Sequence, residues 1–192
     1  MSACHPLLSF SLRYKFNKTE LNCNFNNISS IDLTGFDQLV KLSCERNNLS
    51  ELDLSKASSL ESVRAGYNKL NKIDFTGLTN LLNLNMEFSQ ISAIDLKELV
   101  NIKDLNLKGN TFQTLDLSNN KNLEIFNASM NNQLTSLNLK NGSNIKTFDM
   151  TQNFVPNLKY ICADEEEILT IKNALKSSGS SNCEVNSYCS FT

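Results

Sequence analysis

Apolar residues recur along this chain at fixed offsets within units of 21 or 22 residues. The units begin at Lys18, Leu39, Leu60, Leu81, Ile102, Leu123 and Ile145. Positions four and six of each unit are apolar or small, whereas positions three, five and seven are mostly polar. This alternation predicts a short strand with one buried face. A unit that repeats at a nearly constant length predicts a solenoid, because each coil can bury its apolar side only against its neighbours.

A second apolar group follows the first in each unit, as at Leu49, Leu52 and Leu54. Its last residues also alternate, so we expect an extended segment or short helical turns on the opposite side of each coil. A coil of 21 residues leaves too few residues for a long helix after one strand and two turns.

Position nine of the unit is asparagine in all coils but the fourth, where it is Ser89. At this point the chain leaves the sheet, and an inward amide can donate to and accept from the backbone of adjacent coils. We therefore expect a buried ladder, with Ser89 as its weak rung. The alternative is that these residues form solvent-exposed turns. The ladder would comprise Asn26, Asn47, Asn68, Asn110, Asn131 and Asn153.

The repeat resembles the leucine-rich-repeat family, whose motif L-x-x-L-x-[LC]-x-x-N is matched by Leu39, Leu42, Cys44 and Asn47. The resemblance covers about residues 18–163. It implies an α/β-class, mostly parallel-β solenoid that forms a curved right-handed superhelix. Strands would line the concave side, which usually binds a ligand, and the convex side would be extended, irregular or short 3-10.

The short units are also similar to repeats of secreted and surface proteins of flavobacteria. That similarity implies a bacterial protein that is secreted or displayed on the cell surface. Residues 1–17 lack the pattern of a secretory leader, which would also fit a cytoplasmic protein. Such relatives commonly continue beyond the equivalent of Thr192, so we expect a fragment of a larger protein or a shortened gene product.

The two ends of the chain differ from the repeats and predict caps. Residues 1–17 form the expected N-terminal cap, in which alternation at Phe10, Leu12, Tyr14 and Phe16 predicts an edge strand over the first coil. Residues 18–163 would hold seven full coils and a shortened last one, with a final strand around Ile161.

Residues 164–192 form the expected C-terminal cap, with a helix over about 164–177. Asp164 can cap the helix amides, and Ile168, Ile171 and Leu175 fall on one helix face.

The six cysteines fall into two groups. Cys23 and Cys44 hold the inward sixth position of adjacent coils, which predicts buried thiols. Near the C-terminus we predict a disulfide between Cys162, on the outer face of a strand, and Cys183, on the returning segment. It would stabilise the cap by about 3 kcal/mol. The pairing of Cys4 and Cys189 stays open.

The sequence favours a binding protein over an enzyme. It has one histidine, His5, and no motif of a nucleophile, phosphate loop or metalloprotease, so we expect no catalytic residue, cofactor or metal. The net charge of −2 offers no basic field for nucleic acid, and no apolar run is long enough to cross a membrane. We expect a monomer.

Aspartates occupy position fifteen of five successive units and should point outward. Two explanations stay open: each carboxylate accepts a hydrogen bond from its own turn, or the column binds cations. The column consists of Asp32, Asp53, Asp74, Asp95 and Asp116.

The outward residues of the first strand in each coil are the candidate binding residues. They are polar and mixed in charge, and arginine and tyrosine at position eight add the residue types that dominate interfaces. We expect them to bind a protein or, as second choice, a glycan; a passive scaffold is the alternative. The candidates are Lys41, Glu45, Arg46, Arg64, Tyr67, Asn85, Glu87, Asp104, Asn106 and Lys108.

Overall fold

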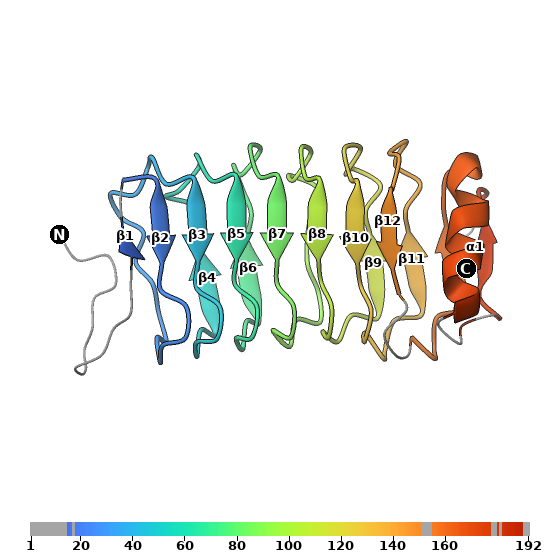
Figure 1. The fold of residues 1–192 in the computed structure, drawn as a ribbon, viewed down its shortest axis with the longest axis horizontal. Helices are drawn as coiled ribbons and strands as arrows, with labels where there is room; N and C mark the ends of the chain where they lie inside the picture. Colours follow the sequence, from blue (N-terminus) through green and yellow to red (C-terminus); the bar gives the residue numbers. More distant parts are fainter. Residues whose placement is uncertain (1–14, 17, 151–154, 178–179, 181, 190–192) are drawn as a thin grey trace.

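A computed structural model describes residues 15–16, 18–150, 155–177, 180 and 182–189. The chain forms a parallel-strand solenoid of about eight turns. The coils lie side by side along one axis, and the only α-helix of the described residues stands at the C-terminal end (Figure 1). Asn153, Cys4 and most of the predicted N-terminal strand lie outside the described residues.

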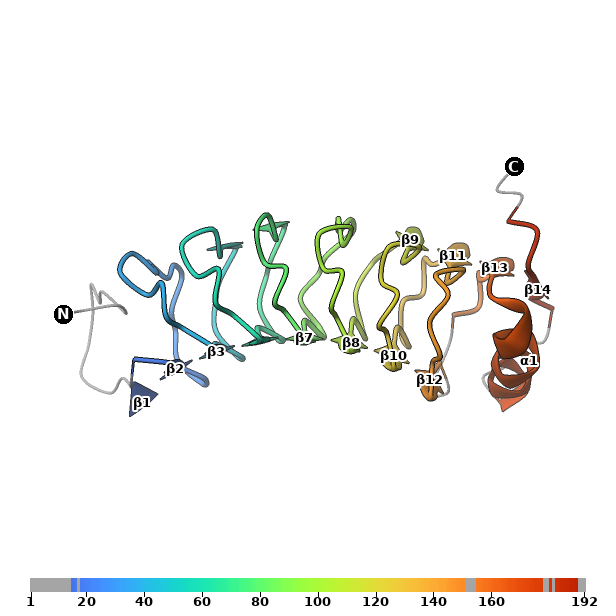
Figure 2. The same cartoon turned by 90° about the horizontal axis from the view of Figure 1, so that it is seen from above.

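One continuous sheet runs along the solenoid in the order β1-β2-β3-β5-β7-β8-β10-β12. All neighbours are parallel except β1 and β2. The sheet lines the concave side of a shallow arc (Figure 2), as the resemblance implied. Its strands are β1 Lys15–Phe16, β2 Glu20–Asn22, β3 Lys41–Ser43, β5 Ser62–Arg64, β7 Asn83–Asn85, β8 Asp104–Asn106, β10 Ile125–Asn127 and β12 Thr147–Asp149.

The convex side is extended, one of the forms we expected, but its strands form two separate sheets. β4 (Glu51–Asp53) pairs with β6 (Lys72–Asp74). A second sheet has the order β14-β13-β11-β9. It comprises β9 Thr114–Asp116, β11 Ser136–Asn138, β13 Tyr160–Cys162 and β14 Glu184–Asn186. In the fourth coil, residues 93–95 form no strand, so the convex ladder is interrupted between β6 and β9.

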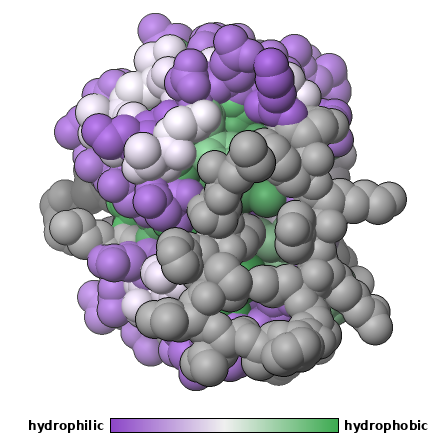
Figure 3. Space-filling model, turned by 90° about the vertical axis from the view of Figure 1, so that its left-hand side faces the viewer, coloured by the Kyte–Doolittle hydropathy of each residue, from purple (hydrophilic) through white to green (hydrophobic). Residues whose placement is uncertain are grey.

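The core is a column of apolar side chains enclosed between the two sides. Strand centres such as Leu42, Val63 and Leu84 lie in register and are at most 2% exposed. Cys23 and Cys44 are fully buried thiols, as predicted. Seen from the N-terminal end, apolar surface lies between hydrophilic sides (Figure 3). The alternation in the sequence therefore places the polar positions on the outer faces.

The asparagine ladder is present and buried. Asn47, Asn68 and Asn110 are 7%, 4% and 3% exposed. The Nδ2 of Asn68 donates to the backbone oxygens of Cys44 and Ala65, at 3.0 and 2.9 Å, and its Oδ1 accepts from the amide of Leu49 at 3.0 Å. Each such side chain ties the turn of its own coil to the preceding coil.

The fourth rung is bridged by its neighbour. The Ser89 hydroxyl donates to the backbone oxygens of Ala65 (3.2 Å) and Glu87 (3.3 Å). Asn110 then accepts from two amides of this coil, those of Ser89 (3.1 Å) and Ile91 (3.0 Å). The shorter side chain is thus partly compensated by the next asparagine.

The C-terminal end departs from our expectation for the last strand. Ile161 of β13 lies in register with Leu137 of β11, which in turn pairs with Leu115 of β9. β13 is therefore the convex strand of the seventh coil rather than the strand of a further, shortened coil. β14 adds one more convex rung, with Val185 opposite Ile161 and 4% exposed.

The helix lies where it was predicted, but its first residues act differently. A 3-10 turn, η1 (Glu165–Glu167), leads into α1 (Ile168–Ser177). We expected Asp164 to cap the helix, yet its side chain makes no capping bond. Its Oδ2 instead accepts from the amides of Asn141 and Gly142, at 3.1 and 2.7 Å, because the preceding coil leaves these amides facing the cap. The helix is thereby attached to the repeats.

The predicted disulfide was wrong in one partner. Cys162 bonds Cys189, whereas Cys183 remains a partly buried thiol. The register that places Tyr160 opposite Glu184 puts Cys183 three positions away from Cys162, roughly 10 Å along the strand. Residue 189 instead returns over Cys162 after the turn that follows β14. Burial raises the pKa of the Cys183 thiol to about 12, so this thiol is a poor nucleophile for exchange.

Glu167 fastens the cap through a buried carboxylate, and this predicts a pH effect. Its Oε1 accepts from the amide of Ile145 at 2.7 Å, while its Oε2 is buried without a partner. Burial, followed by the charges of Asp164 and Glu166, raises the pKa of Glu167. The folded state thus favours the protonated form of Glu167. The stability that this protonated side chain contributes is fully present below the pKa of glutamate in the unfolded chain, about 4.3. It is lost as the pH rises through the higher pKa of Glu167 in the folded protein.

Glu167→Gln should therefore raise the melting temperature near neutral pH by about 2–4 °C, because the amide keeps an acceptor without the buried charge. The gain should disappear in melting curves recorded below about pH 4. Glu51→Gln, which changes an exposed carboxylate of β4, is the control. A destabilised Glu167→Gln variant at neutral pH would contradict this account.

Candidate functional site

The structure brings the predicted binding residues together on the concave face and at one of its rims. Lys41 pairs with Glu20 at 3.0 Å, and Arg64 pairs with Glu45 at 3.2 Å. Both pairs join neighbouring coils, so these four charges already have partners. Exposed pairs of this kind add little to stability.

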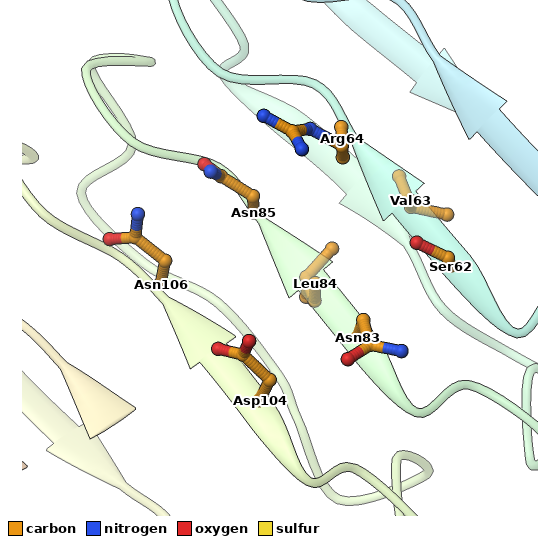
Figure 4. A pocket seen from close by; sticks show the side chains of 8 residues that line it. All are labelled: Ser62, Val63, Arg64, Asn83, Leu84, Asn85, Asp104 and Asn106. Atoms are coloured by element: carbon orange, nitrogen blue, oxygen red, sulfur yellow. The ribbon is translucent and has the colours of Figure 1, made fainter. Parts of the chain in front are cut away.

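A polar trough of about 280 Å³ crosses β5, β7 and β8. Figure 4 shows why it forms: the side chains of Val63 and Leu84 point away from it into the core, so strand backbone makes its floor. Two rows of polar side chains make its sides. One row is Ser62, Asn83 and Asp104, and the other is Arg64, Asn85 and Asn106.

The amides of the second row are engaged with their own strands. The Oδ1 of Asn85 accepts from the amide of Glu87 at 3.0 Å, and that of Asn106 accepts from the amide of Lys108 at 3.1 Å. Their Nδ2 groups stay available as donors along the trough, apart from a long contact of 3.5 Å from Asn106 to Glu87. These bonds fix the direction of both amides.

Asp104 differs from the other charged residues of the face. It is half-buried in the trough, and among the described residues its carboxylate has no ion pair or hydrogen bond. Desolvation raises its pKa. A half-buried carboxylate without a partner can accept a hydrogen bond or a positive charge from a ligand.

The rim beside the trough is formed by position eight of successive coils, where the backbone is left-handed. Phe25, Arg46, Tyr67 and Phe88 have φ values of 57°, 55°, 57° and 51°. This conformation favours glycine and costs other residues about 1–2 kcal/mol each. It sends these side chains sideways along the rim, from each coil toward the next.

The four side chains stack on one another, and we call them the rim stack. The guanidinium carbon of Arg46 lies 5.4 Å from the ring centre of Phe25 and 4.1 Å from that of Tyr67. Tyr67 stacks on Phe88 with ring centres 5.0 Å apart. A Cβ atom at Gly109 would lie 2.4 Å from the Phe88 ring, so glycine makes room for the end of the stack.

Four residues of this face were not among our candidates: Ser62 and Asn83 in the trough, and Phe25 and Phe88 in the rim stack. Their positions in the repeat could have indicated them, because the candidates Asp104 and Tyr67 hold the same positions, three and eight. Phe25 is 68% exposed and Phe88 is half-buried.

The aspartate column is explained by its turns. In all five coils the Oδ1 accepts a hydrogen bond from the amide two residues later; the amide of Ser55, for example, donates to the Oδ1 of Asp53 at 2.9 Å. Hydrogen bonds from the Thr34 side chain and backbone lower the pKa of Asp32, and Ser55 does the same for Asp53. This supports the first of our two explanations. Among the described residues, no group of three His, Cys, Asp or Glu side chains could hold a metal ion.

Comparison with known proteins bears on the fold. No family model matches the chain, and no curated protein matches it. In the described part, no helix is both long and apolar enough to cross a membrane.

Three solved structures from Listeria monocytogenes are similar to this chain. The functional domain of InlJ, which includes a cysteine ladder, is 27% identical, with a TM-score of 0.55 over 88% of this chain and 40% of that one. The internalin InlF is 20% identical, with a TM-score of 0.56 over 89% and 48%. The internalin C2 is 19% identical, with a TM-score of 0.54 over 87% and 79%.

The chain thus spans less than half the length of the first two structures. None of the three comes from a flavobacterium, so that narrower resemblance stays a prediction. The shared features are the stacked parallel strands and the C-terminal helix. The described chain has the leucine-rich-repeat solenoid fold of the internalins.

Proposed function

We propose that this chain is a non-catalytic recognition module that binds a protein ligand through its concave face. The observation that carries the proposal is the polar trough with the rim stack beside it. Neither is needed to bury the core, and both present exposed side chains along one continuous sheet. The three internalin structures share the fold, which supports an interaction module by analogy.

The chemistry of the face favours a protein over a glycan. Sugars often lie against open aromatic faces, but the rim stack covers the facing sides of Arg46, Tyr67 and Phe88 with one another. Paired and unpaired charges across the sheet instead match the mixed surface of a protein. A monomer that makes no contact with nucleic acid stays our expectation.

We further propose a location outside the cell or at its surface. The Cys162–Cys189 disulfide supports it, because such bonds persist in oxidising compartments and are rare in the cytosol.

A passive scaffold or spacer is the second candidate, and one observation favours it. Much of the concave chemistry is satisfied internally, through the Glu20–Lys41 and Glu45–Arg64 pairs and the amide bonds of Asn85 and Asn106. A scaffold would show no binding that depends on this face.

The test compares the full chain with two triple variants in a capture experiment on secreted and surface proteins and on a glycan array. One variant changes Arg64, Asn85 and Asp104 in the trough to alanine, and the control changes Glu51, Lys56 and Lys121, which lie outside the concave sheet and are exposed, to alanine. We expect a protein that binds the wild type and the control alike and binds the trough variant at least about a hundredfold more weakly. If every captured partner binds the trough variant as tightly as it binds the wild type, the scaffold function is favoured.

A further inference from the structure

We propose that Arg46 is the point at which the protein ligand presents a carboxylate, with an apolar residue of the ligand lying next to it on the rim stack. This inference rests on the proposed binding function and names the chemistry of one contact. The occupant is an aspartate or glutamate side chain of the partner.

Arg46 is a cation without an anion. Among the described residues its guanidinium takes part in no ion pair and no hydrogen bond. The cations of β3 and β5, Lys41 and Arg64, are by contrast paired with Glu20 and Glu45. An exposed guanidinium with its donors unused is suited to a two-pronged bond with a carboxylate.

The Arg46 side chain is also held in place before any ligand arrives. The guanidinium lies over the rings of Phe25 and Tyr67, with its carbon 5.4 and 4.1 Å from the ring centres. Stacking of this kind leaves the N–H groups, which point outward in the guanidinium plane, able to donate. Because the rings restrict the rotamer, binding loses less side-chain entropy than it would at an isolated surface arginine.

The rim stack is built on a strained backbone. Four successive coils place large side chains at a left-handed position, and the fifth supplies Gly109 to accommodate Phe88. Stability alone would favour glycine or asparagine at such positions. Strain of this kind concentrates at functional sites.

The charge around Arg46 selects a single carboxylate rather than a polyanion. Glu45 precedes it, and the same position of a nearby coil holds Glu87. A chain of phosphates or sulfates would meet these carboxylates after its first contact. The 68% exposed Phe25 offers the neighbouring apolar surface.

The test uses the full chain to select binders from short random peptides displayed on phage. The best peptide is then synthesised, together with an analogue whose acidic residue is changed to its amide. Affinities are measured for the wild type, Arg46→Ala, Arg46→Lys and the control Lys121→Ala, which changes an exposed cation outside the concave sheet. Unfolding curves verify that each variant is folded.

We expect the selected peptides to share an acidic residue beside an aromatic or aliphatic one. Arg46→Ala and the amide analogue should each weaken binding about tenfold or more, and the two changes together should weaken it no further. Arg46→Lys should fall between, because it keeps the charge without the planar fork, and Lys121→Ala should leave the affinity unchanged.

Two results would overturn this inference: selected peptides that lack an acidic residue, or affinities that change neither with Arg46→Ala nor with the amide analogue. If such peptides still lose affinity with the trough variant, the proposed function of the concave face stands. If no peptide is selected, or if none depends on any concave-face variant, both are overturned.

Discussion

Asn110→Ala is expected to lower the free energy of unfolding by about 3–5 kcal/mol, the largest effect among our predictions. The Nδ2 of Asn110 donates to the backbone oxygens of Met86 and Leu107, each at 2.9 Å. Its Oδ1 accepts from the amides of Ser89 and Ile91. Alanine would leave all four buried groups without this partner, and it would also remove the bridge that supports the fourth rung.

The measurement is urea unfolding followed by circular dichroism. Asn83→Ala is the matched control, because Asn83 is exposed on the concave face and its loss should change stability by less than about 0.5 kcal/mol. Equal effects of the two substitutions would show that the buried amides do not hold the coils together.

Removal of the Cys162–Cys189 disulfide is expected to have the second-largest effect. The bond closes a loop with a sequence separation of 27 residues. In the chain-entropy model, Cys189→Ser should destabilise the C-terminal cap by about 3.5 kcal/mol. Because the stability of a solenoid varies along its length, amide hydrogen exchange of α1 is the appropriate measurement.

A reducing agent should reproduce this loss in the wild type and leave Cys189→Ser unchanged. Cys183→Ser tests the pairing directly, since Cys183 is a thiol and its loss should keep the cap sensitive to reductant. A Cys183→Ser variant that no longer responds to reductant would restore the pairing that we first predicted.

The repeat explains why so much of the fold could be predicted. Leu42, Cys44 and Asn47 each hold one position of a unit, and stacking in register forces each position to meet its equivalent 21 residues away. Burial and hydrogen bonding of one coil thus predict those of the others. The buried column and the asparagine ladder follow directly from that period.

Features that depend on contacts outside the repeat pattern could not be predicted. Cys189 meets Cys162 only because of the register between β13 and β14, and no repeat encodes that register. Asp164 turns to the amides of the preceding coil, although its place before a helix is typical of a cap.

For the site, the sequence indicated the outward positions but not the direction of the rim side chains. Arg46 and Tyr67 were candidates as separate contacts. Their stacking follows from the left-handed backbone at position eight, which the residue types themselves disfavour. The unpaired state of Arg46 likewise depends on which neighbours its side chain can reach.

The convex ladder is interrupted at residues 93–95, so we expect the solenoid to bend most easily there. Coils on either side of it are joined on the concave side by β5, β7 and β8, whereas the outer side has no strand pairing to stretch there. Bending at this place would change the radius of the arc while the hydrogen bonds of the concave sheet are kept. The trough lies across these strands, so under the proposed function we expect its width to follow that bending.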